Sequence, residues 1–588
     1  MPQPARRISR RRAQCRLEEE AAGERRLHPL LRRIFENRNV RTRGELDYAL
    51  NNLHAPESLK GLDAATAILH RALSERRKIL IVGDYDVDGA TATSVALLGL
   101  RAFGAARAGY LVPNRFQHGY GLSESIARIA LQRRPDVVIT VDNGISSVDG
   151  VALLRAAGVA VVVTDHHLAG RQLPDADAIV NPNQPGCEFP SKALAGVGVM
   201  FYLLLALRKR LRAAGWFDPG RRPAVAEPNL AELLDLVALG TVADLVPLDH
   251  NNRILVAQGM MRIRSGRCRP GIKALAEIAG GLCRNLDTSD LGFKIGPRLN
   301  AAGRMDHMST GIECLIADHP TEAMRYAESL GRMNAQRYQV QSSMLRQAEQ
   351  MVSKLLEGGD DSGGGRAGLC LFDADWHQGI VGLVASRIKD QLHRPVVAFA
   401  PADDGRLRGS ARSVAGLHMR DLLESICTRH PGLIRQFGGH AMAAGLTIDA
   451  RRFDAFSDCF SETVGAHFNG RPPDGEILTD GELAAQDLTL ETAELVRAAS
   501  PWGQHFPAPL FDGEFRVTEQ RVVGDRHLKM VLQCIDGSAA LDAIFFRRIE
   551  SGREAPRFDL VKAAYQLKVN EYRGRRSLQL VVEYMQPS

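Results

Sequence analysis

The feature that most constrains the fold of this chain is the alternation of short apolar strands with helices between residues 78 and 181. Strands are expected at residues 78–82, 137–141, 159–164 and 178–180, and helices at 89–103, 123–133 and 147–158. Strands that alternate with helices in this way pair in a parallel sheet, with helices packed on its faces. The sequence therefore predicts an α/β domain with a parallel, doubly wound sheet. Such a sheet binds ligands at the carboxyl ends of its strands.

The chain is too long for one hydrophobic core, because cores stop growing near ~250–300 residues and this chain has 588. Long helices are expected from residue 320 to about 356, followed by a glycine-rich linker and a second α/β unit. Five strands near the carboxyl terminus suit a small barrel of the OB type. We expect a basic, disordered tail at 1–44, the parallel-sheet domain at 45–319, a helical connector and linker at 320–365, the second α/β domain at 366–465, and the barrel at 466–588.

The net charge of +7 is concentrated at the amino terminus, where residues 1–33 carry ten arginines against four glutamates. A solvated tail is the favoured interpretation of this segment over a DNA-binding arm, and any basic groove elsewhere must be local. The nine cysteines are scattered and never spaced C-x-x-C, which argues against disulfides and structural zinc. Scattered cysteines are typical of buried thiols in a reducing compartment, so we expect a cytoplasmic protein. No apolar run is long enough to span a membrane.

Acidic and histidine residues follow three of the expected strands. Asp84, Asp86 and Asp88 follow the first strand, Asp142 follows the second, and Asp165-His166-His167 follow the third. Any one of these acids could cap a helix, but three carboxylates at alternate positions repel one another unless a cation lies among them. Because the carboxyl ends of parallel strands meet at one edge of a sheet, we expect a metal site there.

A further candidate ligand, Asp244, follows an apolar helix, with Asp235 in the same helix as the alternative. An ordinary helix acid is the better interpretation of Asp235. Carboxylate and imidazole ligands without thiolate favour Mn²⁺ or Mg²⁺, and the imidazole favours Mn²⁺. Two such ions, ~3.5–4 Å apart, can activate a water and stabilise the leaving oxygen of a phosphate ester.

The run Asp165-His166-His167 resembles the DHH phosphoesterase superfamily, and further motifs resemble its RecJ exonucleases. These motifs lie at residues 113–122, 296–305, 409–413, 437–445 and 501–504. The resemblance covers roughly residues 45–585. It implies a DHH domain for the parallel sheet, a DHHA1 domain for the second α/β unit, and an OB fold that binds nucleic acid.

The resemblance also implies roles for individual residues. The implied metal ligands are Asp84, Asp86, Asp88, Asp142, His166 and Asp244. Asp142 would bridge two ions, and Asp142, His166 and His167 would form the catalytic set. His167 matches the position that contacts the scissile phosphate. Asp84 is the weakest match, because relatives place other residue types there.

A second group of residues is expected to contact substrate phosphates. Arginine side chains bind phosphate oxygens in pairs, and glycines let a backbone approach them. In residues 405–413, however, composition alone fits a solvated basic strand equally well. The resemblance adds weight to the substrate-binding set Arg115, Arg304, Ser410, Arg412, Gly439 and His440, with Arg298 a weaker candidate. Residues 438–445 are expected to form a small-residue turn that enters a helix.

The favoured function is a metal-dependent exonuclease that hydrolyses single-stranded DNA to mononucleotides in the 5′→3′ direction, in repair and recombination. Direction and product come from the resemblance. It also implies single-stranded DNA as substrate, a single-strand-binding protein and a helicase as further partners, and a monomer. Two alternatives stay open. One is a DHH phosphoesterase that acts on pyrophosphate, cyclic dinucleotides or very short oligonucleotides, and the other is a non-catalytic strand-binding adaptor.

Overall fold

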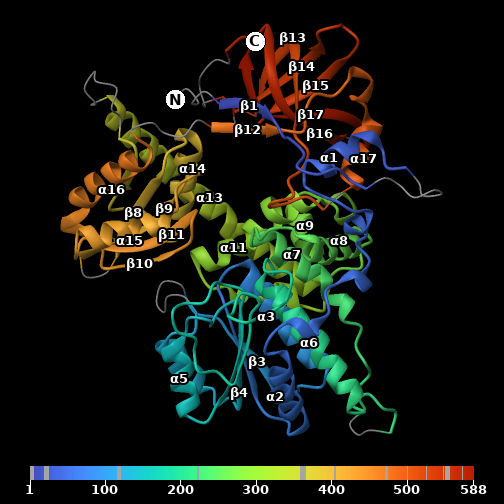
Figure 1. Ribbon diagram of the computed structural model, residues 1–588, viewed down its shortest axis with the longest axis vertical. Coiled ribbons are helices and arrows are strands. Elements are labelled where there is room, and N and C mark those ends of the chain that lie inside the picture. The colour runs from blue at the N-terminus through green and yellow to red at the C-terminus, as the bar shows by residue number, and fades with distance from the viewer. Residues whose placement is uncertain are drawn as a thin grey trace. The chain divides into compact units, whose positions relative to one another are not determined.

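The structure is a computed structural model, and it describes residues 6–18, 26–114, 121–220, 224–357, 366–402, 405–469, 475–499, 501–524, 526–546, 548–549, 556–572 and 574–588. The chain divides into two compact units, Met1–Ser9 with Asn334–Leu478 and Arg10–Met333 with Thr479–Ser588. Figure 1 shows their elements. No helix in the described ranges combines the length and the apolar character that a membrane span requires.

The larger unit is built on a five-stranded parallel sheet, as the sequence predicts. Its strands are β2 (Ile79–Gly83), β3 (Ala108–Leu111), β4 (Val137–Val141), β5 (Ala160–Thr164) and β6 (Ala178–Val180), in the order β3-β2-β4-β5-β6. The sequence did not predict β3, because a four-residue Ala-Gly-Tyr-Leu strand at a sheet edge carries no apolar run.

Helices cover both faces of this sheet because successive strand residues point to opposite sides. Ile79 and Ile81 share a core with α2 (Leu62–Ser74), α3 (Val87–Ala102) and α6 (Gly196–Ala213). Leu80 and Val82 share a second core with α4 (Glu124–Gln132) and α5 (Val148–Ala156). All five residues of β2 are buried. This is the doubly wound arrangement that the alternation of strands and helices predicts.

Helical segments follow the sheet along the chain. They are α7 (Leu234–Ala243), α8 (His250–Arg264), α9 (Pro270–Ile278), α10 (Thr288–Asp290), the π-helical turn η6 (Leu291–Ile295), α11 (Gly296–Met305), α12 (Ser309–Ile316) and α13 (Pro320–Glu357). The connector predicted from residue 320 is therefore one helix of 38 residues.

The smaller unit contains a second α/β sheet. Its strands are β7 (Leu369–Phe372), β8 (Val396–Ala402), β9 (Arg406–Arg412), β10 (Gln436–Gly439) and β11 (Ala443–Asp449), in the order β10-β11-β9-β8-β7, and its helices are α14 (Val381–Leu392), α15 (Met419–Arg429) and α16 (Phe453–His467). Only β7 and β8 are parallel. Residues 438–445 form a hairpin, so the expected turn into a helix was wrong. Gly439 has a φ of 145°, and the His440 amide donates to the Ala443 carbonyl at 2.8 Å, which closes a strand-to-strand turn.

The carboxyl-terminal residues form the predicted closed barrel, within the larger unit. Its strands are β13 (Phe511–Val523), β14 (His527–Cys534), β15 (Ala540–Phe545), β16 (Leu560–Tyr572) and β17 (Arg575–Pro587), closed in the order β13-β14-β15-β17-β16. The helix α17 (Leu490–Ala498) packs against β16 and β17.

The amino-terminal segment was expected to be a disordered tail, but its described residues are ordered. β1 (Arg6–Arg10) pairs with β12 (Gly475–Thr479), and α1 (Pro29–Glu36) follows. Arg10 forms an ion pair with Asp512 at 2.8 Å. Arg38 forms another with Asp480 at 2.8 Å, in which the two side chains are 1% and 0% exposed. The basic residues are held by acids that lie far along the chain, which a local charge pattern cannot reveal.

Candidate metal centre and phosphate contacts

Strand register brings the acidic and histidine turns to one level of the sheet. Gly83 at the end of β2 pairs with Val141 at the end of β4, and Val141 pairs with Thr164 at the end of β5. The turns that carry Asp84, Asp142 and Asp165 therefore begin side by side. This is the convergence that the parallel sheet predicts.

Histidine 166 lies at the centre of the cluster. Its Nε2 is 3.1 Å from Asp142 Oδ1, 3.5 Å from Asp244 Oδ2 and 3.9 Å from Asp88 Oδ2. Three overlapping groups offer ligand atoms that all lie within 4.8 Å of one another: Asp142, His166 and His167; Asp88, His166 and Asp244; and Asp84, Asp86 and Asp142. Every candidate ligand from the sequence lies in this cluster. The alternative, Asp235, instead accepts a hydrogen bond from the Arg269 amide at 2.6 Å.

Close backbone approaches surround these acids. A Cβ on Gly196, the first residue of α6, would lie 2.8 Å from Asp142 Oδ1, and one on Gly240 in α7 would lie 3.0 Å from Asp88 Oδ1. Asp142 itself has a φ of 61°, a left-handed conformation that few residues other than glycine adopt. Two helices can therefore press against the cluster only because they carry glycine at the contact.

Burial and mutual repulsion raise the pKa of these carboxyl groups. Burial, and then the charge of Asp86, raises the pKa of Asp88 to about 7, although Asp88 accepts hydrogen bonds from the Gly196 and Val197 amides at 2.6 and 2.9 Å. Burial and neighbouring carboxylates raise the pKa of Asp142 and Asp244 well above the usual range. Bound cations relieve such repulsion, and the donor set of oxygen and imidazole nitrogen fits Mn²⁺ or Mg²⁺.

Asp165 organises the histidine turn, and sequence reasoning did not assign it a role. Its Oδ1 accepts from the His166 amide at 2.7 Å and the His167 amide at 3.1 Å, and it lies 2.7 Å from His167 Nδ1. Its Oδ2 accepts from the Ile145 amide at 2.9 Å. Burial alone would lower the pKa of His167, but the bond to Asp165 and the nearby acids raise it to about 9. Asp165 therefore fixes the direction of both histidines.

The side chains of two asparagines also donate hydrogen bonds to the backbone of this turn. Asn183 Nδ2 donates to the His166 carbonyl at 2.6 Å, and Asn181 Nδ2 donates to the His167 carbonyl at 3.0 Å. The only sequence signal for them is the Asn-Pro-Asn triplet directly after β6.

In the smaller unit, Ser410 and Arg412 lie next to each other on β9. Arg412 donates through Nη1 to Ser410 Oγ at 2.9 Å and through Nε to Ser386 Oγ at 3.1 Å. A Cβ on Gly382 would lie 2.7 Å from Arg412 Nη2, so α14 meets this pair only through glycine. In the same unit, Gly439 and His440 form the turn of the β10–β11 hairpin.

The remaining phosphate candidates differ in what the structure shows. Arg115 lies outside the described residues. Arg304 is on α11, whose Gly303 approaches so closely that a Cβ would lie 2.0 Å from the Tyr85 carbonyl, between Asp84 and Asp86. Helix α11 therefore packs directly on the acidic turn. Arg298 donates to the carbonyls of Lys294 and Ile278 and has a structural role.

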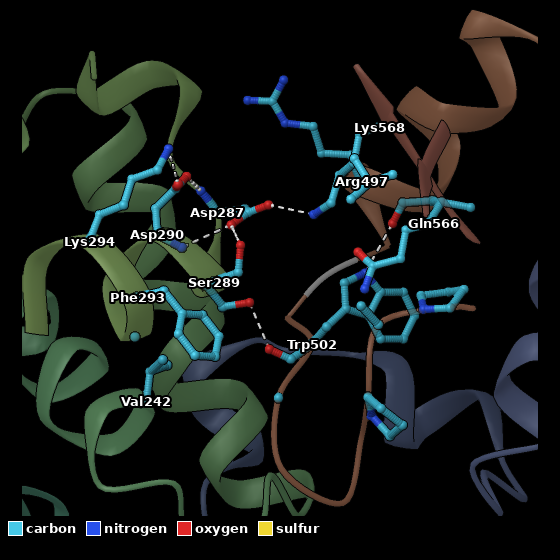
Figure 2. A pocket seen from close by; sticks show the side chains of 18 of the residues that line it. Val242, Asp287, Ser289, Asp290, Phe293, Lys294, Arg497, Trp502, Gln566 and Lys568 are labelled. Carbon is cyan, nitrogen blue, oxygen red and sulfur yellow. Dashed lines mark hydrogen bonds and ion pairs between the residues drawn. The ribbon is translucent and has the colours of Figure 1, made fainter. Parts of the chain in front are cut away.

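A cleft of about 730 Å³ in the larger unit lies between the carboxyl end of α7, the η6 turn, α17 and the barrel. Figure 2 shows η6 with Phe293 and Lys294 on one side, and Lys568 of β16 with Arg497 of α17 on the other. Phe293 is 77% exposed. The lining continues to Leu245, the residue after Asp244. The cleft thus combines an exposed aromatic ring with cations and carboxylates, and the carboxylates are Asp287, Asp290, Glu571 and Glu583.

Comparison with known proteins places these features in context. Residues 78–241 match the DHH family, N-terminal domain, residues 365–466 match the DHHA1 domain, and residues 479–584 match the RecJ OB domain. The single-stranded-DNA-specific exonuclease RecJ of Salmonella typhimurium is 50% identical over 561 residues, which is 95% of this chain and 96% of that protein.

Two crystal structures of RecJ from Thermus thermophilus are also similar. The complex with Mn²⁺ has a TM-score of 0.76 at 30% identity and covers 95% of this chain and 76% of that one. The complex with Mg²⁺ has a TM-score of 0.70 at 28% identity and covers 95% and 75%.

Proposed function

Because this chain belongs to the RecJ family of single-stranded-DNA-specific exonucleases, we propose that it removes mononucleotides from the 5′ end of single-stranded DNA at the acidic edge of its parallel sheet. The observation that carries this proposal is the convergence of five aspartates and His166 at one edge of the sheet, in overlapping groups whose ligand atoms lie within 4.8 Å of one another. The enzyme acts with divalent cations, as the Mn²⁺ and Mg²⁺ complexes of the Thermus protein indicate. We place its activity in DNA repair and recombination.

The residues that would hold two ions are Asp84, Asp86, Asp88, Asp142, His166 and Asp244. When bound, the ions would supply Lewis-acid stabilisation of the phosphate and a bound water that is more acidic than bulk water. The chain itself supplies orientation. Asp165 and the two asparagines fix the histidine turn, and the glycines of α6 and α7 let those helices close over the acids.

We assign His167 to the scissile phosphate. Its Nδ1 is bonded to Asp165, so the Nε2 face of the ring is the one that meets substrate. The buried Asp165 carboxylate favours the protonated imidazole, which can donate to a phosphate oxygen. Positioning by Asp165 is therefore needed for this contact.

Hydrolysis in the 5′→3′ direction requires a binding site for the terminal 5′-phosphate. We assign this site to Ser410 and Arg412. Further contacts are assigned to the Gly439–His440 turn, Arg304 and Arg115. A guanidinium next to a hydroxyl, both on a strand, provides the paired donors that a phosphate monoester accepts. Arg412 is held by Ser386 and Ser410, so its fork is oriented before substrate arrives.

The cleft of Figure 2 is proposed as the path of the strand that follows the terminal nucleotide. Phe293 and Lys294 lie on a π-helical turn, an irregularity found often at functional sites. An exposed ring provides a stacking platform for a base. Lys294 and Lys568 are paired with Asp290 and Asp287 of the same cleft, at 2.6 and 3.2 Å, so the ring carries this assignment rather than the charges. Phe546 lines the same cleft from the barrel and is 51% exposed. The barrel aromatics are thus of two kinds, since Phe545 is only 6% exposed.

We propose that the enzyme works in the cytoplasm as a monomer, with a single-strand-binding protein and a helicase as partners that present its substrate. The alternative of a small-substrate DHH phosphoesterase is less well supported, because the barrel and its cleft would have no function in it. The adaptor alternative leaves the buried acids unexplained.

One assay separates these functions. Labelled single-stranded DNA, duplex DNA and a dinucleotide are each incubated with Mn²⁺ or with EDTA. We expect mononucleotides from the single strand, little product from the duplex, and no product in EDTA. Faster hydrolysis of the dinucleotide than of the long strand would favour the small-substrate enzyme. Metal-independent binding without hydrolysis would favour the adaptor.

A further inference from the structure

The amino ends of the parallel strands, opposite the acidic edge, carry a concentration of positive charge. Two adjoining hollows of about 470 and 230 Å³ share Ile79 and Arg107 in their linings. The cations that line them are Arg76, Arg77, Lys78, Arg107, Arg133 and Arg134, and neither lining contains a carboxylate. Figure 1 labels α2, β3 and β4 in this lower part of the larger unit. We call these six residues the basal cluster.

Helix geometry accounts for part of this charge. In a doubly wound sheet, the helices end where the next strands begin, so α2, α3 and α4 turn their carboxyl ends toward this edge. Cations are favourable there because the helix dipole is negative at that end. Arg77 also pairs with Glu75 at 2.6 Å. The dipole does not account for Arg107 or Lys78, which lie at the starts of strands.

The backbone conformation of two of the arginines, Arg76 and Arg134, indicates that they do more than support the fold. The four helices α2 to α5 each end in the same turn before the next strand, with one left-handed residue. That residue is Gly104 after α3 (φ 98°) and Gly158 after α5 (φ 79°), but Arg76 after α2 (φ 50°) and Arg134 after α4 (φ 49°). Glycine adopts this conformation without strain, and an arginine does not. Two strained turns in the same sheet thus place a guanidinium where glycine would be the more stable choice.

The interactions of these side chains also indicate a surface that is available to a ligand. Arg76, Arg107 and Arg134 are exposed, and none of them forms an ion pair with a carboxylate among the described residues. Arg133 donates to the Tyr110 carbonyl, and Lys78 donates to the Arg133 carbonyl. Two carboxylates lie beside the cluster, Glu75 on Arg77 and Asp136, which accepts from the Lys78 amide at 2.6 Å. Six cations against two acids still leave an excess of positive charge, and such a surface attracts a polyanion. No aromatic residue lines either hollow, so a ligand here is contacted through phosphates rather than stacked bases.

We propose that the basal cluster is a second nucleic-acid-binding surface, which holds the phosphodiester backbone of DNA away from the acidic edge. The strands β2 and β4, which run between the two edges, have five residues each, a length of ~17 Å. DNA bound there lies outside the site of hydrolysis. It belongs to a distant part of the same strand or to a neighbouring duplex region.

The left-handed arginines allow a test in which folding is not put at risk. Replacing Arg76 and Arg134 together with glycine removes two charges and relieves two strained turns. The melting temperature of R76G/R134G is therefore expected to equal or exceed that of the parent chain. A matched control, R420Q/R451Q, removes two exposed arginines from the smaller unit.

Binding is measured in EDTA with a long single strand of about 60 nucleotides, a short one of about six, and a duplex with a single-stranded end, since one OB fold covers ~4–16 nucleotides. For the long strand we expect R76G/R134G to bind roughly tenfold more weakly, about threefold for each phosphate that is no longer neutralised. The slope of log K against log[salt] should fall by about 1.4, since each single-strand phosphate contributes ~0.7. The control should bind like the parent.

Comparison of the long strand with the duplex substrate shows which part of the DNA binds the basal cluster. A loss confined to the long strand places the distant single strand on the cluster, and a loss confined to the duplex substrate places the duplex there. Unchanged affinity and salt slope for both would overturn the proposal. A loss of affinity for polyglutamate with DNA binding intact would also overturn it, and would identify an acidic protein surface as the ligand. Failure of the exonuclease assignment would leave these binding results unaffected, because they require no hydrolysis.

Discussion

Replacing Arg38 with alanine should loosen the amino-terminal segment from the larger unit. The guanidinium donates to Asp480 Oδ1 at 2.8 Å and Oδ2 at 3.1 Å, to the Pro507 carbonyl at 2.8 Å and to the Ile34 carbonyl at 2.7 Å. It also lies 5.1 Å from the centre of the Trp502 ring. Nearly every donor of this side chain is therefore used inside the protein.

The expected size of the effect follows from burial. Arg38→Ala leaves the Asp480 carboxylate buried without its cation, and such a stranded charge costs ~3–5 kcal/mol. Exposed ion pairs contribute only ~0–1 kcal/mol. A loss of ~3 kcal/mol would raise the population of the opened segment by a factor of roughly 150.

Tryptic cleavage measures this population, because the arginine-rich segment is cut when it opens and the rate follows the open fraction. The double variant Arg38→Ala/Asp480→Ala should be cut more slowly than Arg38→Ala, since no charge is stranded. If Arg38→Ala increased the rate by less than about fivefold, equivalent to ~1 kcal/mol, the buried pair would not hold the segment and the reasoning would be wrong.

Four further results are expected at the site. Asp142→Asn should abolish hydrolysis of single-stranded DNA at any Mn²⁺ concentration while the melting temperature is kept; measurable turnover at high Mn²⁺ would remove Asp142 from the essential ligands. Asp165→Asn should lower the free energy of unfolding by ~1.5–3 kcal/mol in urea titrations, because it disturbs a buried charged acceptor of four donors; an unchanged unfolding curve would contradict its positioning role. Arg412→Ala should reduce the preference for 5′-phosphorylated over 5′-hydroxyl ends by ~1.5–3 kcal/mol, or about 10- to 150-fold, in competition assays; an unchanged ratio would place the phosphate elsewhere. Phe293→Ala should weaken binding of long single strands by ~1–3 kcal/mol per stacked base, and equal affinity for long strands in both proteins would exclude the ring as a platform.

The sequence predicted those parts of the site that depend on local pattern and on a general property of parallel sheets. Alternating strands and helices are visible in short windows, and parallel pairing then brings Asp84, Asp142 and His166 to one edge. Asp244 could be placed because it ends an apolar helix. The barrel was also predictable, since its strands are successive and separated by turns.

Other parts could not be predicted because their cause is distant or ambiguous. The order of the amino-terminal segment depends on Asp480 and Asp512, more than 440 residues away from Arg38 and 500 from Arg10. Small residues such as those at 438–445 suit the entry to a helix as well as a hairpin, and only the pairing of β11 with β9 decides for the hairpin. The sequence shows Asp165 only as one residue of a motif. Its positioning role depends on four donors, the amides of Ile145, His166 and His167 and the His167 ring, which come together only in the folded chain.

The pairing of β1 with β12 and of Arg38 with Asp480 joins residues near the amino end of this sequence to partners more than 440 residues further along. Ribosomes add ~5–20 residues per second, and 442 residues separate the two partners. The segment that begins the chain must therefore wait roughly 20–90 seconds for its partner. Until then its arginines are exposed and the ring of Trp502 has not been made. A chain that stops before Asp480 lacks the acid that pairs with Arg38, so we expect its amino-terminal segment to stay open to proteases. Attachment of this segment is therefore a late step, which follows synthesis of the residues up to Asp480.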